Sequence, residues 1–144
     1  MFDIKSAFGF DKDKANQGVD HVFGPDPKED WVTICKIGND NYNRVLKKAF
    51  RAAHEQLELL KTQGEAGEAA AAALDEKIHN EVLAETIVTN WGNGMSDGLT
   101  SIQSTLENRA AILAKYPDFK EACLNFAGMR TNYPMVESVE KVKK

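Results

Sequence analysis

The chain has 144 residues and a formal net charge of −4, with 42% hydrophobic and 28% charged residues. This length fits one domain that can bury a moderate core without metals or disulfides, and the composition argues against wholesale disorder. No segment is strongly basic, which argues against a nucleic-acid partner. No apolar run approaches the ~20 residues needed to cross a bilayer. We therefore expect no membrane contact and a cytoplasmic protein.

The first sixteen residues are polar and rich in charge after Phe2. We expect residues 1–16 to form a flexible N-terminal segment in which residues 11–14 are a solvated loop. Phe8 and Phe10 either anchor this segment to the domain or are available to bind a partner.

Residues 17–37 have the pattern of a β-hairpin. A weak strand over residues 17–23 precedes residues 24–27, which are dense in Gly, Pro and Asp and favour a turn. Residues 31–37 are β-branched and aromatic and give the strongest strand of the chain, which Gly38 ends. Because a lone hairpin is marginally stable in water, it must pack on helices or pair with another strand.

Two long helices are predicted next, over residues 40–62 and 66–90. The first has apolar residues at alternating spacings of four and three, which place them on one helix face: Leu46, Phe50, Ala53, Leu57 and Leu60. Asp40 suits the N-cap or first turn. The second begins with alanines at 69–73, which permit close helix approach but which we interpret as helix-forming residues rather than an interface. The short link makes the helices antiparallel neighbours.

A glycine-rich loop over residues 92–103 leads into two short helices. Ser104 and Glu107 have the spacing of a capping box at the start of the first. Pro117 suits the first turn of the second. Residues 131–144 are expected to be a C-terminal tail.

These elements predict a mainly α (α+β) fold. It is a single compact helical domain over residues 17–130, with about four helices and a small N-terminal β-hairpin at residues 17–37. Two of the helices are long and antiparallel, and two are short and C-terminal.

No combination of residues in the sequence suits catalysis. Cys35 and Cys123 lack the paired spacing of zinc or redox sites and are expected to be buried free thiols. The three histidines show no zinc-type spacing, and the glycines at residues 92–98 fit neither a dinucleotide nor a Walker pattern. We predict a non-enzymatic protein with no catalytic residue, metal site or cofactor.

Several short motifs follow one another in a characteristic order. A strand at residues 31–37 leads into an Asn-x-x-Tyr helix start. A Trp-Gly…Asp-Gly loop and a Thr-x-Glu-Asn helix start come later in the chain. An apolar residue, a proline and an aromatic residue follow them in that order. The residues are Asn39, Tyr42, Trp91, Gly92, Asp97, Gly98, Thr105, Glu107, Asn108, Leu113, Pro117 and Phe119. In this order they resemble the bacteriophage tail assembly chaperone family, over roughly residues 17–130.

The resemblance implies a chaperone that binds the tape measure protein, a long helical and aggregation-prone chain, in the host cytoplasm. Such chaperones keep that protein soluble while tail tube subunits assemble around it, and they are absent from the finished tail. The tail tube protein and further copies of the chain are additional candidate partners. The alternative is a structural virion component, such as a minor tail or connector protein, which remains in mature particles.

Five aromatic residues are the candidates for partner binding or for lining the core: Trp31, Tyr42, Phe50, Trp91 and Phe119. A partner can bind in an apolar groove between helices, or it can add a strand to an exposed strand edge in the hairpin that contains residues 31–37.

Overall fold

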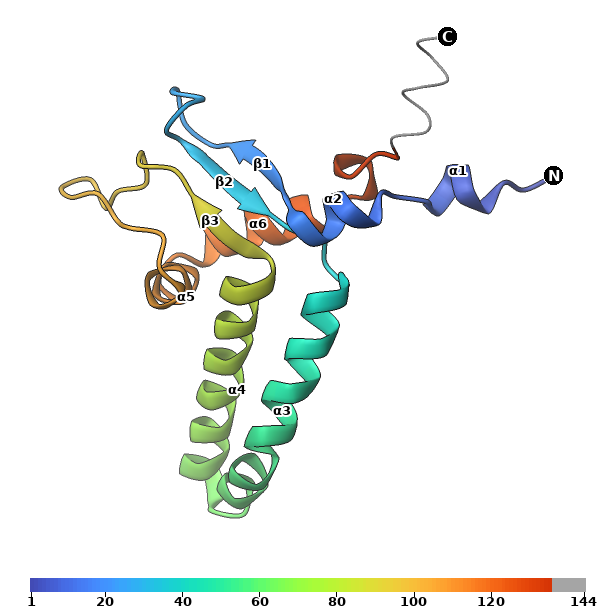
Figure 1. Cartoon of the computed structure of the whole chain (residues 1–144). Coiled ribbons are helices and arrows are strands. Elements are labelled where there is room, and N and C mark those ends of the chain that lie inside the picture. Colours follow the sequence, from blue (N-terminus) through green and yellow to red (C-terminus); the bar gives the residue numbers. More distant parts are fainter. Residues whose placement is uncertain (136–144) are drawn as a thin grey trace, which may run out of the picture.

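The computed structural model of the chain describes residues 1–135, and residues 136–144 of the expected C-terminal tail lie outside the described residues. The elements in chain order are α1 (Ile4–Phe8), α2 (Lys12–Gln17), β1 (Val19–Val22), β2 (Trp31–Ile34), α3 (Asp40–Lys61), α4 (Gly64–Thr86), β3 (Val88–Trp91), α5 (Leu106–Lys115), α6 (Pro117–Gly128) and the 3-10 helix η1 (Arg130–Asn132). The fold is mainly α with a small antiparallel sheet, as predicted. Figure 1 shows α3 and α4 as a long hairpin that projects from a body formed by the sheet, α5 and α6.

The sheet has the order β1-β2-β3, with both neighbouring pairs antiparallel. The predicted hairpin is therefore present, and it also gains the third strand that its stability requires. Val32 and Ile34 of β2 are buried while Trp31 and Thr33 are only half-buried. This alternation turns one face of the sheet toward the core.

The third strand was missed because residues 66–90 were predicted to be one helix. In the structure α4 ends at Thr86, and Val88–Trp91 pairs with β2. The β-branched residues that follow Thr86 explain the change, since they favour extended backbone over helix.

The two long helices pack side by side along the projecting hairpin. The apolar stripe of α3 faces α4, with Leu57 buried and Phe50 half-buried. His79 of α4 lies between two aromatic residues of α3: its Nε2 is 3.4 Å from the Tyr42 hydroxyl, and its ring centre is 6.3 Å from that of Phe50. In the alanine run, only Ala71 is buried.

Asn39 joins the near ends of the two long helices. Its side-chain oxygen accepts a hydrogen bond from the Tyr42 amide at 2.9 Å, which makes it the N-cap of α3, while Asp40 is a first-turn acid. Its amide nitrogen donates to the carbonyls of Lys36 at 2.7 Å and of Thr86 at 3.2 Å. Because Asn39 is only 5% exposed, water does not replace these bonds easily.

Arg109 of α5 supports the same end of α4. Its Nε donates to the carbonyl of Ala84 at 3.0 Å, one of the last carbonyls of a helix that lack an internal partner. Its guanidinium also donates to the backbone and side-chain oxygens of Ser104. The predicted capping role of Ser104 is wrong, because Thr105 is the N-cap of α5 and accepts a bond from the Asn108 amide.

The core lies between the inner face of the sheet, the end of α4 and helices α5 and α6. Its buried residues are Val32, Ile34, Leu83, Ala84, Ile87, Val88, Trp91, Leu113, Cys123 and Ala127. Leu106, the first residue of α5, is 46% exposed.

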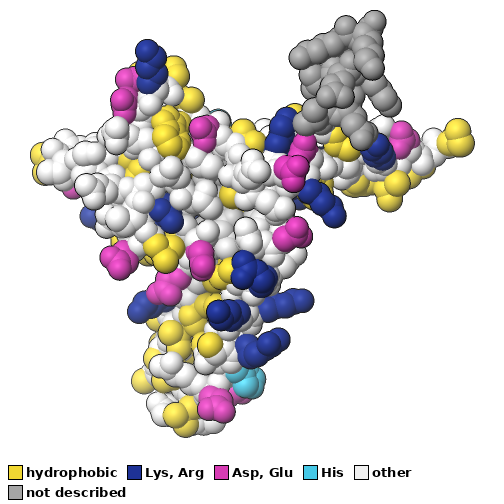
Figure 2. Space-filling model, in the orientation of Figure 1, with side chains coloured by type: hydrophobic (Ala, Val, Ile, Leu, Met, Phe, Trp, Pro, Cys, Tyr) yellow, Lys and Arg dark blue, Asp and Glu magenta, His cyan; other side chains and the backbone are white. Residues whose placement is uncertain are grey.

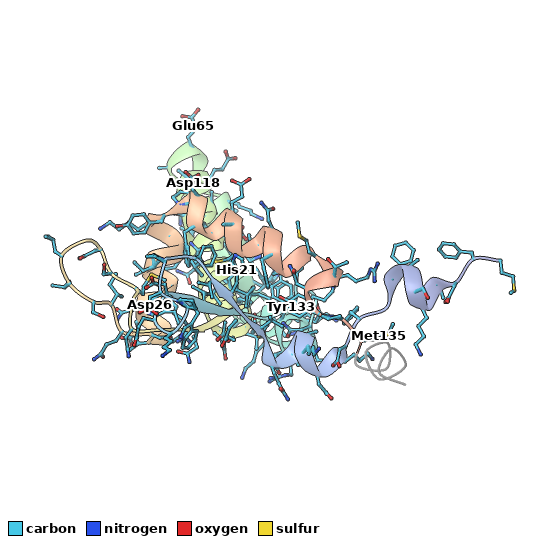
Figure 3. All side chains as sticks on the ribbon, turned by 90° about the horizontal axis from the view of Figure 1, so that it is seen from above. His21, Asp26, Glu65, Asp118, Tyr133 and Met135 are labelled. Carbon is cyan, nitrogen blue, oxygen red and sulfur yellow. The ribbon has the colours of Figure 1, made fainter. Side chains whose placement is uncertain are left out.

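The start of the expected C-terminal tail belongs to this core. Tyr133 is fully buried, and its hydroxyl donates to the carbonyl of Ile34 at 2.9 Å. Its ring packs against Phe126, which in turn packs against His21 of β1. Figure 3 labels Tyr133 and His21. Burial raises the pKa of the Tyr133 hydroxyl above its usual range.

The N-terminal segment contains two short helices instead of only a loop. Residues 11–14, expected to be a solvated loop, cap and begin α2, and Ala15 of this helix is buried. Phe10 is half-buried beneath the Lys36 ammonium group, 4.4 Å from its ring centre. Phe8 is 65% exposed on α1, which extends away from the body (Figure 1).

Two further expectations concern thiols and membranes. Cys35 and Cys123 are both free and buried, as predicted. Among residues 1–135, no helix combines the length and apolarity that a membrane span requires.

Replacement of Asn39 tests its role at the hairpin base. Asn39→Ala removes the cap of α3 and the side-chain donor to the buried Thr86 carbonyl, whereas the Lys36 carbonyl keeps its bond from the backbone amide of residue 39. We therefore expect the substitution to lower the free energy of unfolding by about 2–4 kcal/mol in urea titrations. Asn39→Asp keeps the cap oxygen but cannot donate, and we expect a similar loss. Asn43→Ala, which removes an exposed hydrogen bond to Gly38, is the control and should cost less than about 1 kcal/mol. An Asn39→Asp variant as stable as wild type would contradict this role.

The pH dependence of stability tests the burial of Cys123. Burial raises the pKa of this thiol from 9.0 to about 12. In the interval between these values the unfolded chain binds fewer protons than the folded chain, so stability should fall as pH rises. We expect urea midpoints between about pH 8 and 11 to fall more steeply for wild type than for Cys123→Ala. Equal slopes would show that the thiol is not shielded.

Candidate partner-binding surface

The five aromatic candidates lie in three places. Tyr42 and Phe50 pack on His79 within the α3–α4 hairpin. Trp91 of β3 is 4% exposed in the core, and its indole nitrogen donates to the Ile102 carbonyl at 2.8 Å. Trp31 and Phe119 are half-buried at the surface of the body. The structure therefore brings only the last two to a common accessible region.

That region is a pair of adjoining hollows. One has a volume of about 300 Å³ and is lined by residues that include Phe23, Trp31 and Met95. The other has a volume of about 370 Å³ and is lined by residues that include Met95, Tyr116 and Phe119. Met95 and Ser96 line both. We call Phe23, Trp31, Met95, Tyr116 and Phe119 the aromatic surface.

The turn between β1 and β2 holds one side of the aromatic surface. The Trp31 indole nitrogen donates to the carbonyl of Lys28 at 3.1 Å, which fixes the ring against the turn. Phe23 packs on Phe119 of α6, with ring centres 5.5 Å apart. It also packs edge-on against the ring of His21, with ring centres 4.7 Å apart. These contacts connect the hairpin to α6, and they leave Phe23 43% exposed.

The glycines after Trp91 let the following loop approach this turn. The Gly92 amide donates to the Trp31 carbonyl at 3.0 Å, and the Gly94 amide donates to the Glu29 carbonyl at 2.8 Å. A Cβ atom at Gly92 would collide with the Glu29 carbonyl and with the indole nitrogen of Trp31. Glycine is therefore required for this close approach, which places Met95 beside Trp31.

The Asp97-Gly98 pair forms the turn of a small exposed loop. The Asp97 carboxylate accepts hydrogen bonds from the amides of Leu99 and Thr100 at 2.9 and 2.8 Å. The bond from Thr100 contributes most, and the bond from Leu99 next, to lowering the pKa of this carboxyl group. Gly98 has a φ of +94°, which favours glycine. Leu99 at the tip is 94% exposed. Asp97 thus has a structural role in the turn.

The side chains of the aromatic surface have the chemistry of a protein-binding site. Aromatic residues and methionine are enriched at protein interfaces, and aromatic residues supply much of the binding energy there. Within the part of the chain that the structure describes, no three His, Cys, Asp or Glu side chains are grouped to hold a metal.

A third hollow lies between α4 and α5 and was not predicted from the sequence. It is an open groove of about 740 Å³. Its apolar lining consists of Ala73, Leu106, Ala110, Ala111 and Ala114, and its charged lining of Glu76, Lys77, Glu81, Glu85 and Glu107. Asn80 completes the lining and is 3% exposed. We call this hollow the acidic groove. The alanines at 69–73 were its sequence signal, since Ala73 lines it.

A basic stripe runs along the outer side of α3. Arg44, Lys47, Lys48 and Arg51 are all exposed, and their spacing places them on one helix face. Figure 2 shows Lys and Arg side chains gathered on this side of the hairpin. The sequence alone suggested no basic patch because acidic residues flank this stretch. We call these four residues the basic stripe.

The order of the strands shows which edges of the sheet are unpaired. The hairpin was expected to offer an exposed strand edge; β2 is the central strand and pairs on both sides, so the outer strand of the hairpin is β1. The outer strands are β1 and β3, so strand addition at β2 is excluded.

Comparisons with protein-family models, with curated proteins and with solved structures find no match for this chain.

Replacement of Gly92 tests the close approach of the two loops. Gly92→Ala should lower the free energy of unfolding by about 1–3 kcal/mol, because the added methyl group must displace the Glu29 backbone. Gly128→Ala is the matched control: a Cβ there meets no atom within 4 Å, so its effect should be below about 0.5 kcal/mol. Equal effects of the two substitutions in urea titrations would contradict the assigned contact.

Proposed function

We propose that this chain is a non-enzymatic tail assembly chaperone of a bacteriophage, and that it binds the tape measure protein through the aromatic surface. The observation that carries the proposal is the pair of adjoining hollows that share Met95. It is supported by the order of the motifs from Trp31 to Phe119, which resembles that family.

The two hollows can bind a helix of the tape measure protein, which we call the client. An amphipathic helix presents large apolar side chains three and four residues apart, and each can enter one hollow. Phe23 and Tyr116 are 43% and 41% exposed, so a client that covers them removes apolar area from water. Met95 lies between the hollows, and its flexible side chain can adapt to different client residues.

The exposed N-terminal arm offers a second contact for an aggregation-prone client. Phe2, Ile4 and Phe8 are 73%, 68% and 65% exposed around α1. In this proposal the chaperone acts in the host cytoplasm, keeps the tape measure protein soluble while tail tube subunits assemble, and is absent from the finished tail.

Co-expression with the tape measure protein of the same genome tests the proposal. We expect a soluble complex that co-purifies with wild-type chain. Phe23→Ala and Tyr116→Ala should each weaken binding about tenfold, because exposed aromatic anchors dominate such interfaces. Leu99→Ala, at an exposed position outside the hollows, is the control and should change affinity by less than about twofold.

Two results would contradict the proposal. One is an insoluble tape measure protein with no co-purifying chain. The other is the presence of this chain in purified mature particles, which would instead support the alternative of a minor tail or connector protein.

A further inference from the structure

We infer that Asn93 is a deamidation site, which the folded chain keeps closed by docking its loop on the β1–β2 turn. Once the loop detaches, the reaction changes the main chain there and prevents the loop from docking again. The inference concerns the covalent chemistry of the chain and needs no client. It therefore stands or fails independently of the proposed function.

Asn93 is the only asparagine of the chain that is followed by glycine. Deamidation begins when the backbone nitrogen of the next residue attacks the side-chain carbonyl carbon of asparagine. A glycine at that next position hinders the attack least, because it carries no side chain. The pair Asn93-Gly94 is therefore the most reactive asparagine site that the sequence contains.

The reaction consumes one water molecule and releases one molecule of ammonia. The Gly94 nitrogen loses its proton and bonds to Cγ of Asn93, while the side-chain nitrogen takes up a proton and leaves as ammonia. Water then adds to either carbonyl of the resulting succinimide ring and breaks its bond to the ring nitrogen. The product at residue 93 is aspartate or isoaspartate. In isoaspartate the main chain runs through the side-chain carbons and is one methylene longer.

The packing of the loop requires the glycine that makes Asn93 reactive. A Cβ atom at residue 94 would collide with the Asp30 carboxylate and with the Glu29 carbonyl. Gly94 also lines the hollow that contains Trp31. The close approach that builds the aromatic surface thus places a reactive pair at its edge.

Three features of the docked loop oppose the reaction, although Asn93 is exposed. The Gly94 amide proton, which must leave first, is held in a hydrogen bond to the Glu29 carbonyl at 2.8 Å. The Asn93 carbonyl of the same peptide group accepts a hydrogen bond from the Ser101 hydroxyl at 3.2 Å, which limits rotation of that group. The Asp30 carboxylate lies against Gly94 and disfavours a negative charge on its nitrogen.

Deamidation is therefore coupled to detachment of the loop. Folded proteins open local segments at a lower free energy than global unfolding requires. In the detached loop, the peptide group between residues 93 and 94 has lost all three restraints and reacts like that of an unfolded chain. The rate in the folded protein then equals the unfolded rate multiplied by the fraction of molecules whose loop is open.

Isoaspartate at residue 93 makes the detachment permanent. The amides of Gly92 and Gly94 donate to two carbonyls of the β1–β2 turn, those of Trp31 and Glu29. The length of main chain between the two amides must therefore match the turn. An added methylene removes this match, so the loop cannot form both bonds, and Met95 loses its position beside Trp31.

Peptide mapping with an isoaspartate assay tests the inference at mildly alkaline pH, on the folded chain and on the chain in urea. Folded wild type should deamidate at residue 93 at least about tenfold more slowly than the chain in urea. Gly92→Ala strains the docked loop, and Ser101→Ala removes the bond to the Asn93 carbonyl. In the folded state Gly92→Ala should react about tenfold faster than wild type, and Ser101→Ala should also react faster.

Gly128→Ala is the matched control and should react like wild type, since a Cβ there meets no atom within 4 Å. Circular dichroism melts establish that each variant is folded, and Ser101→Ala carries the comparison if Gly92→Ala does not fold. The coupling is overturned if folded wild type reacts as fast as the chain in urea, or if no folded loop variant differs from Gly128→Ala. The site itself is overturned if residue 93 remains asparagine in urea.

The purified isoaspartate form tests the effect on the loop. Hydrogen exchange of the Gly92 and Gly94 amides should be about tenfold faster in this form than in wild type. Asn93→Asp has the same charge but a main chain of normal length, so its exchange should stay within about twofold of wild type. Equal protection of the isoaspartate form and wild type would overturn the inference that the lengthened loop cannot dock.

Discussion

The structure depends on the buried contact at which Asn39 joins the end of β2, the start of α3 and the end of α4. One amide side chain caps α3 and donates to carbonyls on both neighbouring segments. Arg109 supports the same helix end from α5. Helix ends that are buried need such partners, because their last backbone groups have none within the helix. The position and direction of the α3–α4 hairpin follow from these few bonds.

The binding surfaces are consequences of this junction. Because α4 ends at Thr86, the chain can enter β3 and complete the sheet, and Gly92 then brings the next loop against the β1–β2 turn. That loop places Met95 at the centre of the aromatic surface. The same Arg109 that supports α4 also holds α5 beside it, which forms the acidic groove. The aromatic surface and the acidic groove therefore both depend on this junction.

The sequence predicted the elements that local chemistry defines. The stripe from Leu46 to Leu60, the turn residues before Trp31 and Pro117 at the start of α6 each have a local cause, and each was placed correctly. It could not predict features that distant residues decide. β3 requires β2 as a partner. Tyr133 is buried where its ring meets Phe126 and its hydroxyl meets the Ile34 carbonyl, and Ser104 accepts hydrogen bonds from Arg109 instead of capping α5. Of the aromatic candidates, Trp31 and Phe119 share a surface only because Phe23 lies between the hairpin and α6.

Native-state hydrogen exchange measures directly whether the Asn39 junction is the common support. Amides of Tyr42, Ile87 and Asn90, which lie at the start of α3, after α4 and in β3, should exchange only through one shared opening of high free energy. Amides near the hairpin tip, around residues 60–68, should exchange through openings of lower free energy, because little of the tip is buried. Separate opening of the helix junction while the sheet stays protected would contradict the account.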